Sequence, residues 1–210
     1  MPRIERIIVG KLHTNCYVLH DNGECAIIDP GDEFGSIDRF ISSNKLTPVC
    51  VIATHGHFDH VLAAPEFFSK YGLKLMINES DAGMLGEAAG MARLFTGQEF
   101  RSEIPNEEFR DGHVFKIGNC RVTAKQYPGH TPGSTILEAG NETLLTGDTL
   151  FRGSIGRVDF GGSLESMRAS LKKLKGLDKD YVILPGHGES TSLKEEKESN
   201  PFLSDNFTGS

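Results

Sequence analysis

The chain has 210 residues, with 29 acidic and 22 basic side chains and a formal net charge of −7. A chain of this length is typical of one domain that buries well over half of its unfolded surface, and its acidic balance, with no Lys/Arg block, argues against a nucleic-acid partner. Residues 1–6 lack a secretion-type apolar run and no later segment reaches the length of a membrane span, so we expect a cytoplasmic protein with no membrane partner.

We predict a single domain over residues 1–203 and a flexible tail over 204–210. The chain opens with strands at 3–9 and 14–19, and the second is expected to form a hairpin with 26–29 through the turn Asn-Gly at 22–23. This register places Cys25 opposite His20 and away from Cys16. Since no CxxC pair occurs, the four cysteines are expected to be free thiols.

From residue 36 onwards the hydrophobic pattern predicts an alternation of helices and strands. Helices are expected at 36–44, 61–71, 164–174 and 193–199, and strands at 49–53, 74–78, 114–117, 120–126, 135–138, 143–146 and 181–184. Residues 80–112 break this alternation, because glycines interrupt a weakly helical run that carries Met and Phe side chains. A loose segment of this length is often functional. Two interpretations stay open, a mobile lid over a substrate and a helix pair packed on the core.

The stretch 54–60, with the sequence THGHFDH, is the most informative part of the chain. It places three imidazoles and a carboxylate directly after a short apolar strand, and imidazole suits zinc, iron and copper. If the backbone stays extended, His55 and His57 point to one side while Asp59 and His60 face a second position. One short segment can therefore serve two metal ions. A histidine-rich turn without a ligand is the alternative.

Three more ligand-type residues follow predicted strands further along the chain. His130 lies in PGHTPGS, Asp148 in GDT and His187 in PGHG. The flanking glycines allow tight turns, which carry each side chain towards the end of its strand.

In combination these motifs resemble the metallo-β-lactamase superfamily. The stretches 54–60, 128–134 and 147–159 are similar to the glyoxalase II-like (hydroxyacylglutathione hydrolase-like) enzymes in particular, and the resemblance covers residues 4–203. It implies an α/β (α+β) fold, a four-layer αββα sandwich of two mixed β-sheets flanked by helices, with the site at one edge.

The resemblance also implies two divalent metal ions per chain, zinc first, with iron or manganese as alternatives. It implies a ligand set of two groups of three and one shared carboxylate: His55, His57 and His130 for metal 1, Asp59, His60 and His187 for metal 2, and Asp148 between them. Asp29, at the end of its strand, would not bind a metal itself but would hold the histidine motif in position.

The activity that the resemblance implies is hydrolysis of a small-molecule thioester such as S-lactoylglutathione, by a hydroxide that the two metals share. Asp59 is expected to act in catalysis as a proton relay, and Arg157 to contact the substrate. Only 210 − 187 = 23 residues follow His187, so a helical glutathione-binding extension is not expected and the enzyme should be permissive.

Three other interpretations stay open. A persulfide dioxygenase-like enzyme shares the histidine motif but works through a single iron. A lactonase or phosphodiesterase could have the same fold. An interaction module with a relict site is the alternative from a different class. The oligomeric state and the native metal also stay open.

Overall fold

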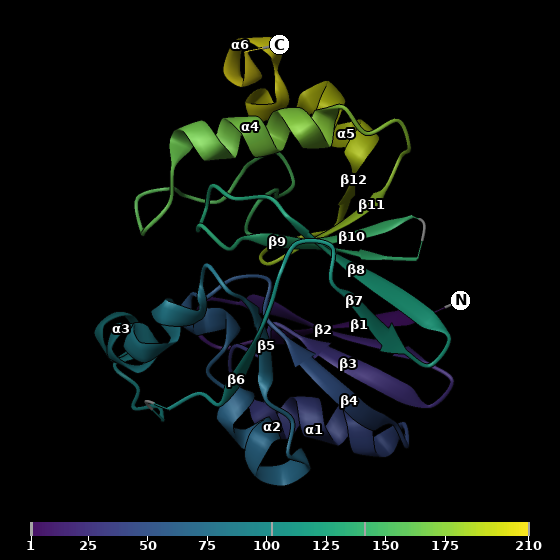
Figure 1. Ribbon diagram of the computed structural model, residues 1–210, viewed down its shortest axis with the longest axis vertical. Helices are drawn as coiled ribbons and strands as arrows, with labels where there is room; N and C mark the ends of the chain where they lie inside the picture. Colours follow the sequence, from purple (N-terminus) through teal and green to yellow (C-terminus); the bar gives the residue numbers. More distant parts are fainter. Residues whose placement is uncertain (1, 102, 141, 210) are drawn as a thin grey trace.

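The structure is a computed structural model that describes residues 2–101, 103–140 and 142–209. Two β-sheets lie face to face, and each carries helices on its outer side, so that four layers stack along the long axis of the molecule (Figure 1). The predicted four-layer α/β sandwich is confirmed.

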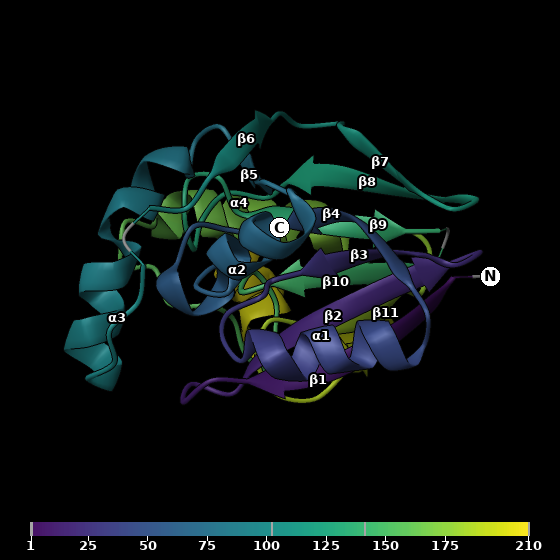
Figure 2. The same cartoon turned by 90° about the horizontal axis from the view of Figure 1, so that it is seen from below.

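Within the described residues, the first sheet has six strands, which follow one another in chain order: β1 (Arg3–Val9), β2 (Thr14–Asp21), β3 (Glu24–Ile28), β4 (Thr47–Ile52), β5 (Leu75–Asn78) and β6 (Asn106–Phe109). The first three form an antiparallel meander, whereas β3 to β6 pair in parallel. Helices α1 (Phe34–Ser43) and α2 (Ala64–Tyr71) cover the outer face of this sheet (Figure 2). Because β3 to β6 run in parallel, their carboxyl ends lie together at one edge of the sheet.

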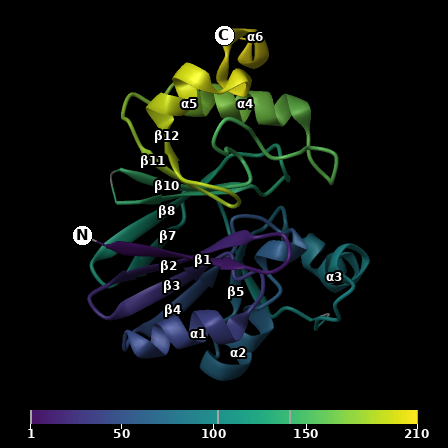
Figure 3. The same ribbon diagram turned by 180° about the vertical axis from the view of Figure 1, so that it is seen from behind.

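The second sheet also follows the chain order and has six strands in the described ranges: β7 (Val114–Ile117), β8 (Cys120–Gln126), β9 (Thr135–Ala139), β10 (Thr143–Gly147), β11 (Val182–Pro185) and β12 (Thr191–Ser192). Its pairs are antiparallel except β10 and β11, which run parallel. Helices α4 (Leu164–Lys175) and α5 (Leu193–Ser199) cover its outer face, and helix α6 (Asp205–Thr208) lies on the side of α4 away from the sheet (Figure 3). The turn η3 (Pro201–Leu203) also packs on α4.

Alternation along the strands produces three apolar layers, one between the sheets and one beneath each set of helices. In β2, Val18 faces the helices whereas Leu19 faces the other sheet. In β10, Leu145 faces the first sheet and Leu144 packs with α4. Each of these side chains is 0–2% exposed, and burying one contributes about 1.5–3 kcal/mol. Both faces of both sheets are thus covered.

The β2–β3 hairpin has the predicted register, with Cys25 opposite His20, and all four cysteines are free thiols as predicted. Most predicted elements lie within two residues of the observed ones. The helix predicted from residue 61 begins instead at Ala64, because residues 58–60 form the short helix η1 (Phe58–His60) and Pro65 stands in the first turn of α2.

The segment 80–112 contains the turn-like helix η2 (Ala82–Glu87), helix α3 (Ala88–Thr96) and strand β6. Over residues 205–208, where the sequence favoured a frayed tail, the structure has α6, whose Phe207 ring packs edge-on against Phe202 at 5.1 Å between centroids. No helix in the described part of the chain is long and apolar enough to cross a membrane.

Candidate metal centre

All seven predicted ligands meet at the edge where β4, β8, β10 and β11 end. Each loop that leaves one of these strands carries one or more of them, so parts of the chain far apart in sequence converge. They form three overlapping groups, in each of which the ligand atoms lie within 4.8 Å of one another: His55, His57 and His130; His55, His60 and Asp148; Asp59, His60 and His187.

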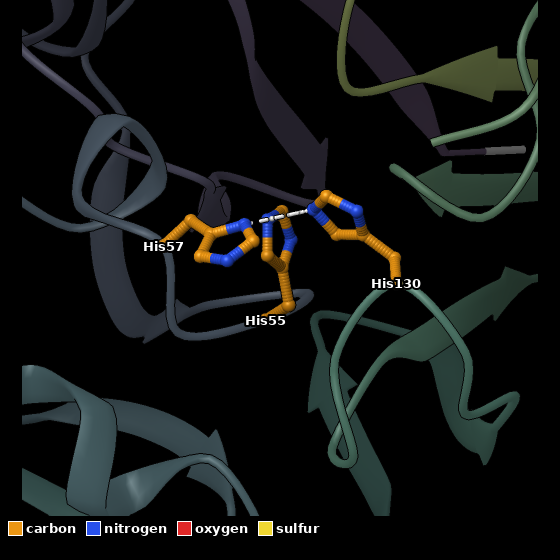
Figure 4. Close-up of side chains that lie close together, drawn as sticks. All are labelled: His55, His57 and His130. Carbon is orange, nitrogen blue, oxygen red and sulfur yellow. Dashed lines mark hydrogen bonds between the residues drawn. The ribbon is translucent and has the colours of Figure 1, made fainter. Parts of the chain in front are cut away.

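The three imidazoles of the first group point towards one another (Figure 4). Nδ1 of His57 lies 2.8 Å from Nε2 of His130, which lies 3.2 Å from Nε2 of His55. The other ring nitrogens face backbone carbonyls: Nδ1 of His130 donates to the oxygen of Arg157 at 2.6 Å, and Nε2 of His57 to that of Phe160 at 3.2 Å. Since a carbonyl oxygen can only accept, the hydrogens lie on these outer nitrogens and the inner ones present lone pairs.

Asp29 sets the orientation of His55 through Thr54. The backbone N–H and the hydroxyl of Thr54 both donate to the Asp29 carboxylate, at 2.7 and 2.8 Å. The Thr54 hydroxyl hydrogen is therefore engaged, and Oγ1 is left to accept from Nδ1 of His55 at 3.1 Å. Oδ2 of Asp29 also lies 3.0 Å from Nδ1 of His60. One buried carboxylate thus leaves the Nε2 atoms of both imidazoles free to bind a cation. Residues that hydrogen-bond to a metal ligand commonly orient it in this way.

The second group is built around Asp59 and Asp148. Nε2 of His60 lies 3.5 Å from an oxygen of each carboxylate, and Nε2 of His187 lies 3.2 Å from Asp59 and 3.6 Å from Asp148. Nδ1 of His187 donates to the backbone oxygen of Leu12 at 3.2 Å. Asp148 also approaches the first group, because its Oδ2 lies 3.5 Å from Nε2 of His130. Its carboxylate stands between the two groups.

Several of these buried atoms lack the hydrogen bonds that buried polar atoms normally make. Nε2 of His60 and Oδ1 of Asp148 are fully buried without a hydrogen-bond partner among the described residues, whereas Nδ1 of His60 faces Asp29 at 3.0 Å. In addition, lone pairs of the first group face one another at 2.8 and 3.2 Å with no hydrogen between them. Cations would relieve both defects. The donor set of imidazoles and carboxylates, without thiolate, fits divalent zinc, iron or manganese.

The electrostatics divide the site into an acidic and an imidazole half. Burial opposes the charged form of His60, but the carboxylates of Asp59, Asp29 and Asp148 outweigh it and raise the pKa of His60 to about 10. Burial raises the pKa of Asp148 to about 6. In the other half, burial and the neighbouring His57 lower the pKa of His130 to about 3. Without a cation the acidic half keeps a proton on His60, which metal binding would displace.

Two residues that support the centre were not predicted. Asp81 is fully buried and accepts hydrogen bonds from the N–H groups of Gly56 at 2.9 Å and Gly133 at 2.6 Å and from the hydroxyl of Thr131 at 2.6 Å. It joins the loop of His55 to the loop of His130. Thr14 donates from its hydroxyl to Oδ2 of Asp59 at 2.9 Å. No local motif marks either residue, because their partners lie 25 to 52 residues away.

A cavity of about 930 Å³ opens over the ligands, and His57, Asp59, His130, Asp148 and His187 all line it. Further lining residues come from the β1–β2 turn, from η1, η2 and α3, and from residues 151–161. The predicted substrate contact Arg157 lies in this wall. Its guanidinium, however, donates two hydrogen bonds of 2.6 Å to Asp159 and stacks 4.2 Å from the ring centre of Phe160.

A centre of clustered histidines and aspartates at the edge of a four-layer α/β sandwich defines a class of metal-dependent hydrolases. This chain belongs to the metallo-β-lactamase superfamily, whose sequence model matches residues 9–187. The superfamily predicted from the motifs is therefore confirmed.

Similar proteins match this chain over nearly their whole length. An uncharacterized protein of Mycobacterium leprae is 41% identical, over 92% of this chain and 95% of its own. The hydroxyacylglutathione hydrolase GloC of Haemophilus influenzae is 35% identical, over 95% and 97%. Among solved structures, TTHA1623 in a di-iron-bound form matches with a TM-score of 0.86 and 30% identity, over 94% of this chain and 99% of its own.

Proposed function

We propose that this protein is a binuclear metal-dependent thioesterase of the glyoxalase II type. The observation that carries the proposal is the position of Asp148, whose carboxylate oxygens lie 3.5 and 3.6 Å from imidazole nitrogens of both ligand groups. A carboxylate in this place can serve two cations at once. The 35% identity to a hydroxyacylglutathione hydrolase supports a thioester as the substrate.

The ligands would act in the two groups described above, with Asp148 shared. Bound divalent ions supply an activated water at neutral pH and stabilise negative charge on the substrate carbonyl oxygen. The protein's part is to fix the imidazoles in one tautomer through Asp29, Arg157 and Phe160, as the hydrogen bonds of the outer nitrogens indicate. This preorganisation removes the need to rotate these imidazoles when the ions bind.

We assign the proton transfer to Asp59. Burial raises its pKa, but His60 and His187 outweigh burial and hold the pKa well below the usual range, so the group is ionised. Its Oδ2 accepts from Thr14 and faces His187, which leaves Oδ1 for the proton. In the reaction, the water oxygen bonds to the carbonyl carbon and the C–S bond breaks. One proton passes through Asp59 to the departing sulfur, and the products are a thiol and a carboxylic acid that ionises in solution.

The convergence of Asp59, His60 and His187 within 4.8 Å supports a second metal site, which a mononuclear dioxygenase would leave unused. We propose zinc as the native metal, with iron as the alternative in view of the di-iron-bound relative. We further propose a cytoplasmic location and a small-molecule thioester as the partner, since four free thiols suit a reducing compartment.

Metal analysis combined with an assay tests the proposal. The full chain, purified with zinc and iron available, should hold two ions and hydrolyse S-lactoylglutathione or another thioester. Asp148→Ala should abolish activity, whereas His113→Ala, an exposed histidine outside the site, should not. A single bound iron, with oxygen uptake on a persulfide and no thioester hydrolysis, would establish the dioxygenase. Hydrolysis confined to lactones or phosphodiesters would establish those activities instead.

A further inference from the structure

Three aromatic rings from separate elements form one wall of the cavity. Phe58 of η1 stacks on Phe95 of α3, with 5.8 Å between ring centres and an interplanar angle of 18°. Phe95 meets Phe160 edge-on, also at 5.8 Å. Phe58 directly follows a metal ligand in the sequence, and the backbone oxygen of Phe160 accepts from the ring of His57. The aromatic wall therefore begins at the first ligand group and leads away from it.

Helix α3 extends this wall to the mouth of the cavity. Leu94 and Phe95 both line the cavity but remain 76% and 49% exposed. Leu12 in the β1–β2 turn also lines the cavity and is 44% exposed. This turn contacts the end of α3, because Nζ of Lys11 donates to the backbone oxygen of Thr96 at 2.6 Å. Large apolar side chains gathered at the mouth of a site point to an apolar ligand that covers them.

The cavity offers little to an anionic group. Among its described lining residues, Arg157 is the one Lys or Arg side chain, and its charge is already paired with Asp159. Glu87 adds a further negative charge to the lining. The carboxylates of glutathione and the phosphates of coenzyme A would thus find no unpaired cation there. The part of a thioester that suits this wall is a neutral acyl chain, and the thiol part is left to extend towards solvent.

We propose that the cavity selects thioesters by an apolar acyl chain several carbons long, bound along Phe58, Phe95 and Leu94, and that a lactoyl group is not the preferred substrate. This inference rests on the proposed thioesterase function. Burying a methylene group favours binding enough to raise kcat/KM roughly two- to fourfold for each one that reaches the wall.

A chain-length series tests the inference on the metal-loaded full chain. The substrates are the acetyl, butyryl, hexanoyl and octanoyl thioesters of N-acetylcysteamine, a small neutral thiol, and of glutathione. We expect kcat/KM to rise by about fiftyfold or more from acetyl to octanoyl, with the two thiols within roughly tenfold of each other. A fall or no change along the series overturns the inference and leaves the thioesterase standing. Failure to cleave any thioester overturns the proposed function and the inference with it.

Variants then test whether this wall is responsible. Phe95→Ala and Leu94→Ala should each flatten the chain-length dependence several-fold, and Phe95→Leu should restore part of it. Phe68→Ala is the matched control, since Phe68 is 38% exposed on α2 and outside the cavity. If both α3 variants keep the wild-type dependence, the chain binds elsewhere and the inference is wrong. A preference of about a thousandfold for the glutathione thioesters would also overturn it.

Discussion

Oδ1 of Asp81 accepts a 2.6 Å hydrogen bond from the backbone N–H of Gly133, a residue 52 positions further along the chain. Its other oxygen holds the N–H of Gly56 and the hydroxyl of Thr131. The fit is tight, because a Cβ atom added at Gly133 would lie 2.6 Å from Cγ of Asp81. A single carboxylate thus fixes the spacing between the loop that carries His55 and His57 and the loop that carries His130.

Replacing Asp81 should loosen the first metal group. Asp81→Ala leaves two buried N–H groups, those of Gly56 and Gly133, without an acceptor, at a cost of about 1–3 kcal/mol for each unsatisfied group, whereas Asp81→Asn keeps one acceptor oxygen and should be intermediate. We expect urea unfolding to give a lower free energy of unfolding, and we expect the variants to lose zinc to a chelator faster than the wild type does. Asp38→Ala is the control, since Asp38 binds Lys70 and Tyr71 far from the site. Wild-type zinc retention in Asp81→Ala would contradict this role.

Asp148 and His187 should differ in how they affect the metal content. Asp148 approaches ligands of both groups, whereas His187 belongs to one. Asp148→Ala should therefore weaken the binding of both ions, because the negative charge of the shared carboxylate also offsets the repulsion between two close cations. His187→Ala should leave close to one ion per chain. Elemental analysis after dialysis measures both, and equal retention by the Asp148 variant and the wild type would refute the bridge.

The hydrogen bond from Lys11 to Thr96 should restrain α3. Helix α3 packs mainly on the short helices η1 and η2, so this contact holds its C-terminal end to the rest of the protein. In Lys11→Met, amide hydrogen exchange over 88–96 should become faster while that of β4 stays unchanged. Lys74→Met, which removes the exposed ion pair with Glu107, is the control. If 88–96 exchanges as slowly as β4 in both variants, the helix is part of the rigid core and not a lid.

Stability should fall at alkaline pH because of the thiols of Cys25 and Cys50. Burial raises the pKa of Cys25 and of Cys50 from 9.0 to about 12. The folded state therefore favours the protonated thiol. This contribution is fully present below pH 9 and is lost as the pH rises towards 12, by at most roughly 1.4 kcal/mol per thiol and pH unit. Urea unfolding at several pH values should show a shallower decline for Cys50→Ala than for the wild type. Parallel pH profiles for the two proteins would rule this out.

Local patterns predicted most of the fold. Strand β8 has the expected bounds because apolar and polar residues alternate along it, and α5 because its charged face is continuous. The strand β6 was missed, since its sequence Asn-Glu-Glu-Phe carries no alternation and it lies at the edge of its sheet. β12 is too short to show a period. Both strands are defined by hydrogen bonds to the neighbouring strand, β5 for β6 and β11 for β12, and not by their own sequence pattern.

The residues of the candidate site likewise include some that local sequence predicts and some that it does not. Each of the seven expected ligands stands in a short motif next to a strand end, and the structure brings all seven together. Asp81 and Thr14 act only through partners distant in sequence, so no window of the sequence reveals them. The partner of Arg157, in contrast, lies two residues away, and a bidentate contact with Asp159 occupies the charge that was expected to meet the substrate.

Because each sheet is built from one continuous half of the chain, the metal centre spans two pieces that could be made separately. The strands β1 to β6 end at Phe109, and β7 to β12 begin at Val114. The exposed turn 110–113 between them is a natural place to divide the protein. The first fragment would carry the ligands from 55–60 and the second the remaining three, so each ligand group would be complete only after reassembly. Added zinc should then promote association of the two fragments, and recovery of hydrolytic activity would measure that association.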